Sequence, residues 1–344
     1  MNKFVRIIAS VVAVACLLTA VYLYNRFVAG TDVPADLDEN VVMIPSNSSF
    51  EEVLTILKEN DLVQNEATFR FLAEKMNYKK DPMRSGRFRV QPGWSMVDLI
   101  RHLRNGEQAP VTLVLTNERL LEEVAAKAAR FIEPDSADFM ALFHDEAYLK
   151  EIGYSKETLM SLFIPNSYEF YWNSSPQEFV DRMIREHKNF WEKDGRLKKA
   201  NALNLDPKEV YTLASIVEKE TQSSEEKPRM AGVYLNRLET GMRLQADPTC
   251  VFATRDFEAR RVTHYHTKFD SPYNTYLYAG LPPGPISMAS IASLDAVLNA
   301  EDHEYVYFCA KGDGSGLHAF AKTLSGHNRN AAKYRENLRK RGLR

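Results

Sequence analysis

An uncharged apolar run near the N-terminus, residues Ile7 to Tyr24, constrains this chain more than any other feature of its sequence. Roughly 18 apolar residues are close to the minimum for a helix that spans a bilayer. Lys3 and Arg6 precede the run, and the positive-inside rule therefore keeps the N-terminal tail in the cytoplasm. We predict a single-pass anchor over residues 1–30 in the inner (cytoplasmic) membrane, with the rest of the chain outside the cytoplasm.

A cleaved signal is the alternative interpretation of this segment. The small residues 13–15 before Cys16 resemble a cleavage site, and also a poor lipoprotein site. The apolar run continues beyond Cys16 as far as Tyr24, which favours an uncleaved anchor. Both interpretations place the body of the protein outside the cytoplasm.

Composition excludes some functional classes. The chain of 344 residues is long enough for two or three domains, and its formal net charge of −2 provides no global basic field, so we expect no nucleic-acid partner. Cys250 and Cys309 match no metal-binding or thioredoxin-like spacing. They can pair in an oxidising compartment, although two distant cysteines are more often unpaired. His264 and His266 have no further ligand in evidence, and we expect neither a metal nor a cofactor.

The next segments predict a small α+β module. Residues 30–39 form a polar, acidic linker without a periodic pattern. Stretches 44–57 and 90–103 each predict a strand, a turn with proline, a serine helix cap (Ser49 and Ser95) and an amphipathic helix, with another helix over 66–76 between them. Such units resemble LysM modules, which bind N-acetyl sugars. We therefore interpret residues 31–110 as a linker and a LysM-like module, the alternative being a spacer without carbohydrate affinity.

Residues 111–344 predict a larger mixed α+β domain. Its part from about 116 to 201 is mostly helical, with Thr116 as the expected cap of a helix over 118–131, and an aromatic stretch at 162–172 suits a packed core better than a sugar platform. The part from 202 to 344 predicts helices and a late hairpin, over residues 207–221, 228–240, 288–298, 304–310 and 317–321. The whole chain is thus of the α+β class.

The helix over 207–221 carries the first candidate for chemistry. Asp206 can cap it, Pro207 suits its first position, and Glu209 completes a capping box. At about 100° per residue, Glu218 borders the apolar face. A carboxylate there is partly desolvated, which raises its pKa and lets it donate a proton. A glutamate near a helix end is, however, usually a solvated charge.

Several ordered motifs make that candidate more specific. They span residues 213–221, 232–238, 244–249, 272–276 and 280–286. In this order they closely resemble the endolytic murein transglycosylases, the YceG-like or MltG family of bacteria, and the resemblance covers nearly the whole chain. It implies that Glu218 is the catalytic acid/base and that further side chains lie in or near the glycan cleft: Gln245, Asp247, Tyr273, Asn274 and Tyr276.

Alternatives remain open for these residues. Asp247 can instead belong to a turn or a helix cap, and Tyr273 and Tyr276 can belong to the core. His318 lies in a segment, 316–321, that fits the family's Gly-x-His-x-Phe pattern, although Ala321 replaces a commonly polar residue, which puts a contact from this strand in doubt.

The resemblance implies a reaction with a single carboxylate. A lytic transglycosylase cleaves the MurNAc-GlcNAc β-1,4 bond and leaves a 1,6-anhydro-MurNAc end. One alternative is a hydrolase with Asp247 or Glu220 as second carboxylate, although Glu220 lies about 200° around the helix from Glu218. Another is a non-catalytic, membrane-tethered glycan-binding protein. The expected partner is the nascent peptidoglycan strand, whose elongation the enzyme would terminate, and peptidoglycan synthases at the membrane are a plausible second partner.

Overall fold

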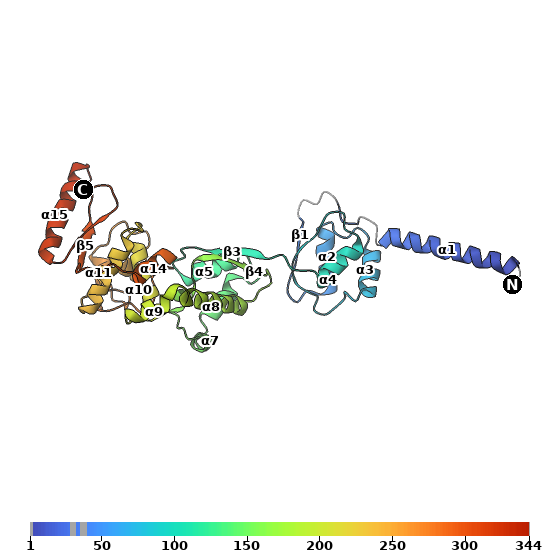
Figure 1. Cartoon of the computed structure of the whole chain (residues 1–344), viewed down its shortest axis with the longest axis horizontal. Helices are drawn as coiled ribbons and strands as arrows, with labels where there is room; N and C mark the ends of the chain where they lie inside the picture. The colour runs from blue at the N-terminus through green and yellow to red at the C-terminus, as the bar shows by residue number, and fades with distance from the viewer. Residues whose placement is uncertain (1–2, 28–31, 35–39, 344) are drawn as a thin grey trace. The chain divides into compact units, whose positions relative to one another are not determined.

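The computed structural model describes residues 3–27, 32–34 and 40–343 (Figure 1). Its first element is helix α1, Lys3–Phe27, which contains the apolar run Ile7–Tyr24. By length and composition this helix can cross a membrane, and the run is not buried by the rest of the chain. The prediction of one long apolar helix is confirmed, and so is the mixed α+β class of the chain.

The chain divides into two compact units, which are described separately. The first unit comprises Met1–Thr112, Phe131–Glu133 and Glu169–Ser175, and the second comprises Leu113–Arg130, Pro134–Tyr168 and Pro176–Arg344.

The first unit contains two strands and three helices after α1. In chain order they are β1 (Val41–Ile44), α2 (Phe50–Glu59), α3 (Glu66–Lys75), β2 (Gly86–Arg89) and α4 (Met96–Asn105). The two strands pair antiparallel, with Val41 opposite Arg89. Ser49 and Ser95 cap α2 and α4, as predicted, because each hydroxyl accepts a hydrogen bond from a backbone N–H of the first turn.

Part of the predicted linker packs against this unit. The N–H groups of Asp32 and Val33 donate to the carbonyl oxygen of Trp94 at 3.1 and 3.0 Å, and the carboxylate of Asp32 accepts from the N–H of Met96 at 2.9 Å. Val33 is only 1% exposed. Residues 32–34 of the predicted linker are therefore held against the first unit, because an apolar side chain and an aspartate inside the acidic stretch have partners on the turn before α4. Residues 30, 31 and 35–39 lie outside the described part of the chain.

The second unit begins with two short strands and several helices. They are β3 (Val111–Leu115), α5 (Leu121–Ala128), α6 (Ser136–Phe143), α7 (Glu146–Glu151), η1 (Leu159–Leu162), β4 (Asn166–Phe170), α8 (Pro176–Glu192), η2 (Lys193–Gly195) and α9 (Arg196–Ala202). β3 pairs with β4, so the aromatic stretch contributes a strand, whose Tyr168 is buried.

The start of α5 differs from the prediction. The N–H of Thr116 donates to the Glu118 carboxylate, and the helix begins only at Leu121. Glu123 closes its first turn instead, because its carboxylate accepts from the N–H of Arg119 at 2.6 Å. Thr116 therefore precedes the helix and does not cap it.

Helix α10 (Pro207–Glu220) is the centre of the second unit. Asp206 and Glu209 form the predicted capping box at its start. Every residue from 210 to 217 is buried, since neighbours surround the helix on all sides. Figure 1 shows α11 (Lys227–Glu239) and α14 (Ile291–Leu298) against it, and α12 (Asp247–Thr254) also contacts it.

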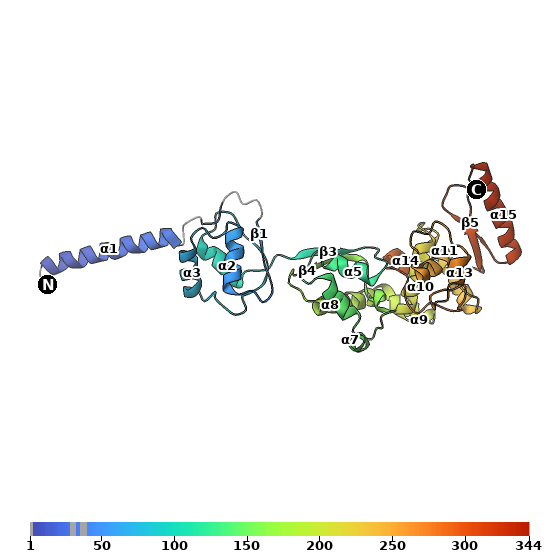
Figure 2. The ribbon, with the colours of Figure 1, turned by 180° about the vertical axis from the view of Figure 1, so that it is seen from behind.

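The end of the chain forms the predicted hairpin. β5 (Tyr307–Ala310) and β6 (His318–Ala321) pair antiparallel, with Ala310 opposite His318. Helix α15 (Leu324–Lys340) contacts both strands and lies beside β5 in Figure 2. The short helix α13 (His264–Lys268) completes the unit, and the helix predicted from residue 288 begins at Ile291, where Ser290 caps it.

Candidate active site

Glu218, the predicted acid/base, accepts hydrogen bonds from three side chains. Its Oε2 atom lies 2.8 Å from Lys227 Nζ and 2.5 Å from the hydroxyl oxygens of Ser290 and Ser293. The side chains of Glu218 and Lys227 are 17% and 8% exposed, so this is a largely buried ion pair.

This environment reverses the expected protonation of Glu218. Burial raises the pKa of its carboxyl, but the hydrogen bonds from Lys227, Ser290 and Ser293 and the charge of Lys227 outweigh burial, so the pKa is lowered. The prediction of a raised pKa is wrong, because α11 and α14 supply partners that helical periodicity alone does not reveal. In this arrangement Glu218 is a carboxylate near neutral pH and has no proton to donate.

Glu220, two residues later, has the properties expected of a proton donor. Its Oε1 atom accepts a hydrogen bond of 2.7 Å from the hydroxyl of Tyr234, a fully buried residue of α11. Burial raises the pKa of Glu220 to about 7, with a further raising effect from the negative charge of Asp247; the Tyr234 hydrogen bond and the charge of Arg237 act in the opposite direction. Near neutral pH this carboxyl both holds and releases a proton.

A cavity of about 280 Å³ brings Glu220 together with Asp247. Asp247 is the first residue of α12, and its Oδ1 atom accepts a hydrogen bond of 2.5 Å from the hydroxyl of Tyr276. Glu220 does lie on another face of α10 than Glu218, as the helical angle predicted. That face is not fully exposed to solvent, however, because α12 packs beside it and places the carboxylate of Asp247 at the same cavity.

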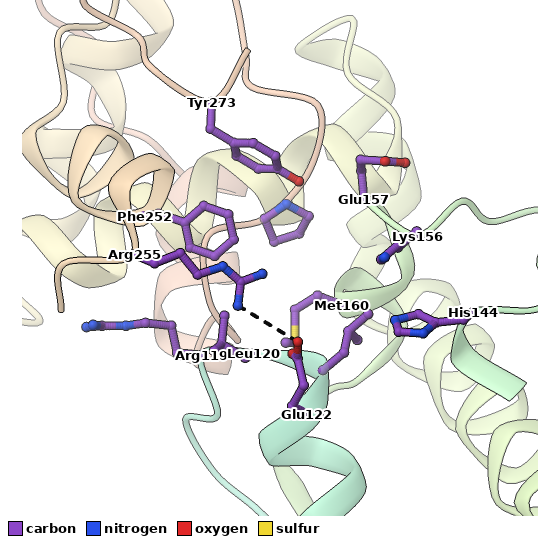
Figure 3. A pocket seen from close by; sticks show the side chains of 12 residues that line it. Arg119, Leu120, Glu122, His144, Lys156, Glu157, Met160, Phe252, Arg255 and Tyr273 are labelled. Carbon is purple, nitrogen blue, oxygen red and sulfur yellow. Dashed lines mark ion pairs between the residues drawn. The ribbon is translucent and has the colours of Figure 1, made fainter. Parts of the chain in front are cut away.

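Two further cavities adjoin this one. Arg119 and Phe252 also line a cavity of about 200 Å³, where Figure 3 shows Tyr273, Lys156 and the ion pair of Arg255 with Glu122 at 3.8 Å. Arg119 and Lys219 also line a wider cavity of about 700 Å³. Arg119 lines all three cavities, which are therefore neighbours in the second unit, and we call them together the groove.

The other predicted site residues have different positions. Asp247 and Tyr273 line the groove, and burial raises the pKa of Tyr273 to about 12. Tyr276 donates its hydroxyl hydrogen bond to the Asp247 carboxylate from a neighbouring loop. Gln245 is exposed, with a left-handed backbone (φ 47°), and its N–H donates to the Thr275 carbonyl oxygen at 3.1 Å.

Asn274 does not face the groove. It is fully buried, and its side-chain amide donates to the carbonyl oxygens of His266 and Phe269 at 3.1 and 2.8 Å, while its Oδ1 atom accepts from the N–H of Tyr276. This side chain therefore fixes the loop that carries Tyr273 and Tyr276, and its expected place in or near the glycan cleft stays a prediction.

His318 lies at the start of β6, close to the C-terminal end of α10. Its Nδ1 atom is 3.0 Å from Oε2 of Glu226, a carboxylate that is also 3.5 Å from the hydroxyl of Thr221. The residues lining the three cavities described above do not include His318. A contact between His318 and the glycan stays a prediction, and Glu226 is the residue that connects this strand to the end of α10.

Tyr234, Arg119 and Lys219 were not among the predicted site residues. Tyr234 lies in the motif at 232–238, so the only signal for it was its place in that ordered series. Within the described residues, no group of His, Cys, Asp and Glu side chains is positioned to hold a metal ion. His266 instead pairs with Asp256 at 3.0 Å, and Cys250 and Cys309 are free thiols.

Comparison with known proteins yields consistent matches. The sequence profile of the YceG-like family matches residues 42–333. A protein of Bacillus subtilis (strain 168) named endolytic murein transglycosylase is 28% identical over 310 residues, which cover 85% of this chain and 84% of that protein. A protein of the same name from Streptococcus pneumoniae (strain D39) is 26% identical over 362 residues, which cover 95% of this chain but only 65% of the streptococcal protein.

A solved structure agrees with these matches. The crystal structure of a YceG-like protein from Listeria monocytogenes superposes with a TM-score of 0.56 at 26% identity, over 84% of this chain and 97% of that one.

Proposed function

The chain belongs to the YceG-like family, and from this premise we propose that it is a peptidoglycan lytic transglycosylase in which Glu220 is the acid/base, with Glu218, the residue that the resemblance implies, as the alternative. The observation that carries the proposal is the Glu220 carboxyl at the groove, with a pKa of about 7. The names of the bacillary and streptococcal relatives support the activity.

The reaction needs one group that gives a proton and then takes one. Neutral Glu220 protonates the glycosidic oxygen as its bond to C1 of N-acetylmuramic acid breaks. The resulting carboxylate removes the proton from the C6 hydroxyl of the same sugar, whose oxygen attacks C1 and closes a 1,6-anhydro ring. Water is not consumed, and Glu220 ends protonated, ready for another cycle.

Tyr234 and Asp247 adjust this proton transfer in opposite directions. The Tyr234 hydroxyl stabilises the carboxylate form of Glu220, whereas the negative charge of Asp247 favours the neutral form. Burial is the largest cause of the raised pKa of Glu220, and these two contacts modify that effect, leaving the pKa near the pH at which giving and taking a proton are equally easy.

A hydrolase is the second candidate, because two carboxylates line one cavity. In that case Asp247 would activate a water molecule or attack C1 while Glu220 donates the proton. The hydrogen bond from Tyr276 occupies one oxygen of Asp247, which favours a supporting role for this residue. The products decide, since hydrolysis leaves reducing ends and transglycosylation leaves anhydro ends.

The rest of the chain suits an enzyme that works close to a membrane. We assign residues 1–30 to a cytoplasmic tail and single-pass anchor in the bacterial inner membrane, 31–110 to the linker and LysM-like module, and 111–344 to the catalytic domain. The order β1-α2-α3-β2, with an antiparallel strand pair, supports the LysM-like assignment. An open groove accepts the interior of a strand, which agrees with endolytic cleavage of nascent glycan. The anchor would keep the enzyme close to the membrane, where peptidoglycan synthases are its second proposed partner.

The test is the chemistry of the ends that the purified protein produces. Digests of sacculi by the unaltered protein, Glu220→Gln and Glu218→Gln are analysed by mass spectrometry. We expect anhydro-ended products from the unaltered protein, none from Glu220→Gln, and a residual yield from Glu218→Gln in proportion to its folded fraction. Full anhydro yield from Glu220→Gln would refute the assignment, and reducing ends would favour the hydrolase.

A further inference from the structure

Two cationic side chains in the groove have no acidic partner. Arg119 stacks over the ring of Phe257, with its guanidinium carbon 4.5 Å from the ring centroid, and Lys219 lies beside Glu220 on α10. Neither side chain forms an ion pair with any residue in the described ranges of the chain. Both are partly buried, so water solvates their charges incompletely.

Two of the carboxylates nearby are engaged elsewhere. Glu118 pairs with Lys127 at 2.9 Å, and Glu123 accepts the N–H groups of Arg119 and Leu120 at the start of α5. Asp247 lines the same cavity as the two cations, but it accepts a hydrogen bond from the Tyr276 hydroxyl and forms no ion pair with either of them in the described part of the chain. Glu258, which also lines the widest cavity, is exposed.

The two cations also oppose each other. Burial lowers the pKa of Lys219, and the positive charge of Arg119 lowers it further, against weaker raising effects from Glu218 and Glu123. Two partly buried like charges destabilise each other unless an anion is bound between them. Such an arrangement in a groove is typical of a site for an anionic ligand.

The position of these cations relative to Glu220 limits what that anion can be. Arg119 and Lys219 line the same cavity as Glu220, and Arg119 also lines the cavity of Figure 3. In a peptidoglycan strand the sugar rings are neutral. The negative charges are carboxylates on the branch of N-acetylmuramic acid, carried either by the peptide stem or, once the stem is removed, by the lactyl group itself.

We propose that Arg119 and Lys219 form a subsite for a carboxylate on the muramic acid branch, next to the bond that Glu220 cleaves. The inference rests on the proposed function for its choice of ligand. The guanidinium group can bind a carboxylate through two parallel hydrogen bonds, while Lys219 contributes a single charge. The subsite would make muramic acid, and not N-acetylglucosamine, the sugar whose C1 lies at Glu220.

Binding to a catalytically inactive protein tests this subsite without turnover. Arg119→Gln and Lys219→Gln are each introduced into the Glu220→Gln chain, with Lys198→Gln, an exposed lysine of α9 that lines none of the three cavities, as the matched control. Calorimetry measures Kd for stem-bearing strands, for strands stripped by an amidase, which exposes the lactyl carboxylate, and for neutral chitooligosaccharides. Thermal melting confirms that each variant is folded.

We expect Arg119→Gln and Lys219→Gln each to raise Kd for a charged strand by about tenfold, with a weaker salt dependence, while chitooligosaccharide binding and the control are unaffected. A loss confined to stem-bearing strands assigns the stem carboxylate, and a loss that persists on stripped strands assigns the lactyl carboxylate. Equal losses on charged and neutral glycans, or no loss at all, would overturn the subsite. If the charge-dependent binding is found but the unaltered protein cleaves no strand, the proposed reaction fails and the subsite stands.

Discussion

Replacing Tyr234 by phenylalanine removes one hydrogen bond from the carboxyl of Glu220 and leaves the buried ring in place. In the structure the Tyr234 hydroxyl donates to Glu220 Oε1 at 2.7 Å, and this bond lowers the pKa of a carboxyl that burial has raised to about 7. Its loss favours the neutral form. The Tyr234→Phe variant should therefore have a Glu220 with a higher pKa than the unaltered protein.

The size of the shift follows from the strength of such a bond. A hydrogen bond to a charged group contributes about 1.5–3 kcal/mol, and 1.36 kcal/mol corresponds to one pKa unit. The neutral carboxyl also accepts this hydrogen bond, only less strongly, so the net shift lies at the lower end, about one unit. The pKa of Glu220 should then rise from about 7 to about 8.

The assay is the pH dependence of kcat/KM for release of anhydro-ended glycan between about pH 5 and 9, because its alkaline limb reports the pKa of the essential acid in the free enzyme. Tyr234→Phe should move this limb up by about one unit. Asp247→Asn should move it down, since the negative charge that raises the pKa of Glu220 is lost. Tyr278→Phe, which removes a hydroxyl bound to Asp270 at 2.6 Å, is the matched control and should leave the limb unchanged.

Opposite shifts in the two variants are the decisive result. An alkaline limb that is identical in Tyr234→Phe and the unaltered protein, or that moves the same way in both variants, would refute the assignment of Glu220 as the acid. If Lys227→Met shifts the alkaline limb while Tyr234→Phe and Asp247→Asn do not, the acid is Glu218.

Three further outcomes concern stability. Glu218→Gln leaves the buried ammonium of Lys227 without its charge partner and should lower the free energy of unfolding in urea by about 3 kcal/mol. Adding Lys227→Met should recover most of that loss, and an unchanged urea midpoint in the single variant would contradict the buried pair. Because the pKa of Glu220 is raised in the folded state, protonation of this carboxyl stabilises the fold below about pH 4.5, and the stabilisation declines as pH rises to about 7. Glu220→Gln should remove this decline, which amounts to up to about 3 kcal/mol, in thermal melts compared at pH 5 and 8. The same loss of stability between these two pH values in both proteins would contradict the raised pKa. Val33→Ala should destabilise the first unit by about 1–2 kcal/mol and speed proteolysis of the linker before β1, whereas unaltered cleavage would show that residues 32–34 are not held.

Much of the fold follows from signals within a few residues of each other. The capping box of Asp206 and Glu209 begins α10 where predicted, the serine caps begin α2 and α4, and the late hairpin forms from adjacent strands. Hydrogen bonds of this kind join neighbours in the sequence, so they can be predicted from the sequence without knowledge of the rest of the chain. Thr116 failed as a cap because Glu123 competes for the same first turn of α5.

The different pKa shifts of Glu218 and Glu220 depend on contacts that no local signal contains. Glu218 and Glu220 share one helix end. Helical periodicity placed Glu218 at the border of the apolar face, and the family resemblance implied that it is the acid/base. The ion-pair partner of Glu218 is Lys227 on α11. The hydroxyl that binds Glu220 belongs to Tyr234, further along the same helix, and a charge that raises the pKa of Glu220 belongs to Asp247 on α12. A pKa is determined by every charge and dipole within a few ångströms, and those neighbours are set by packing.

The sequence by itself therefore determined the N-terminal apolar helix, the α+β class, the family and the helix that carries both candidate glutamates. The tertiary structure alone decided that the pKa of Glu218 is lowered and that of Glu220 raised, that Asn274 is a buried loop residue, and that Arg119 and Lys219 line one cavity with Glu220 and Asp247. Periodicity and capping act along the chain over one or two helical turns, whereas protonation and ligand binding depend on side chains that only folding brings together.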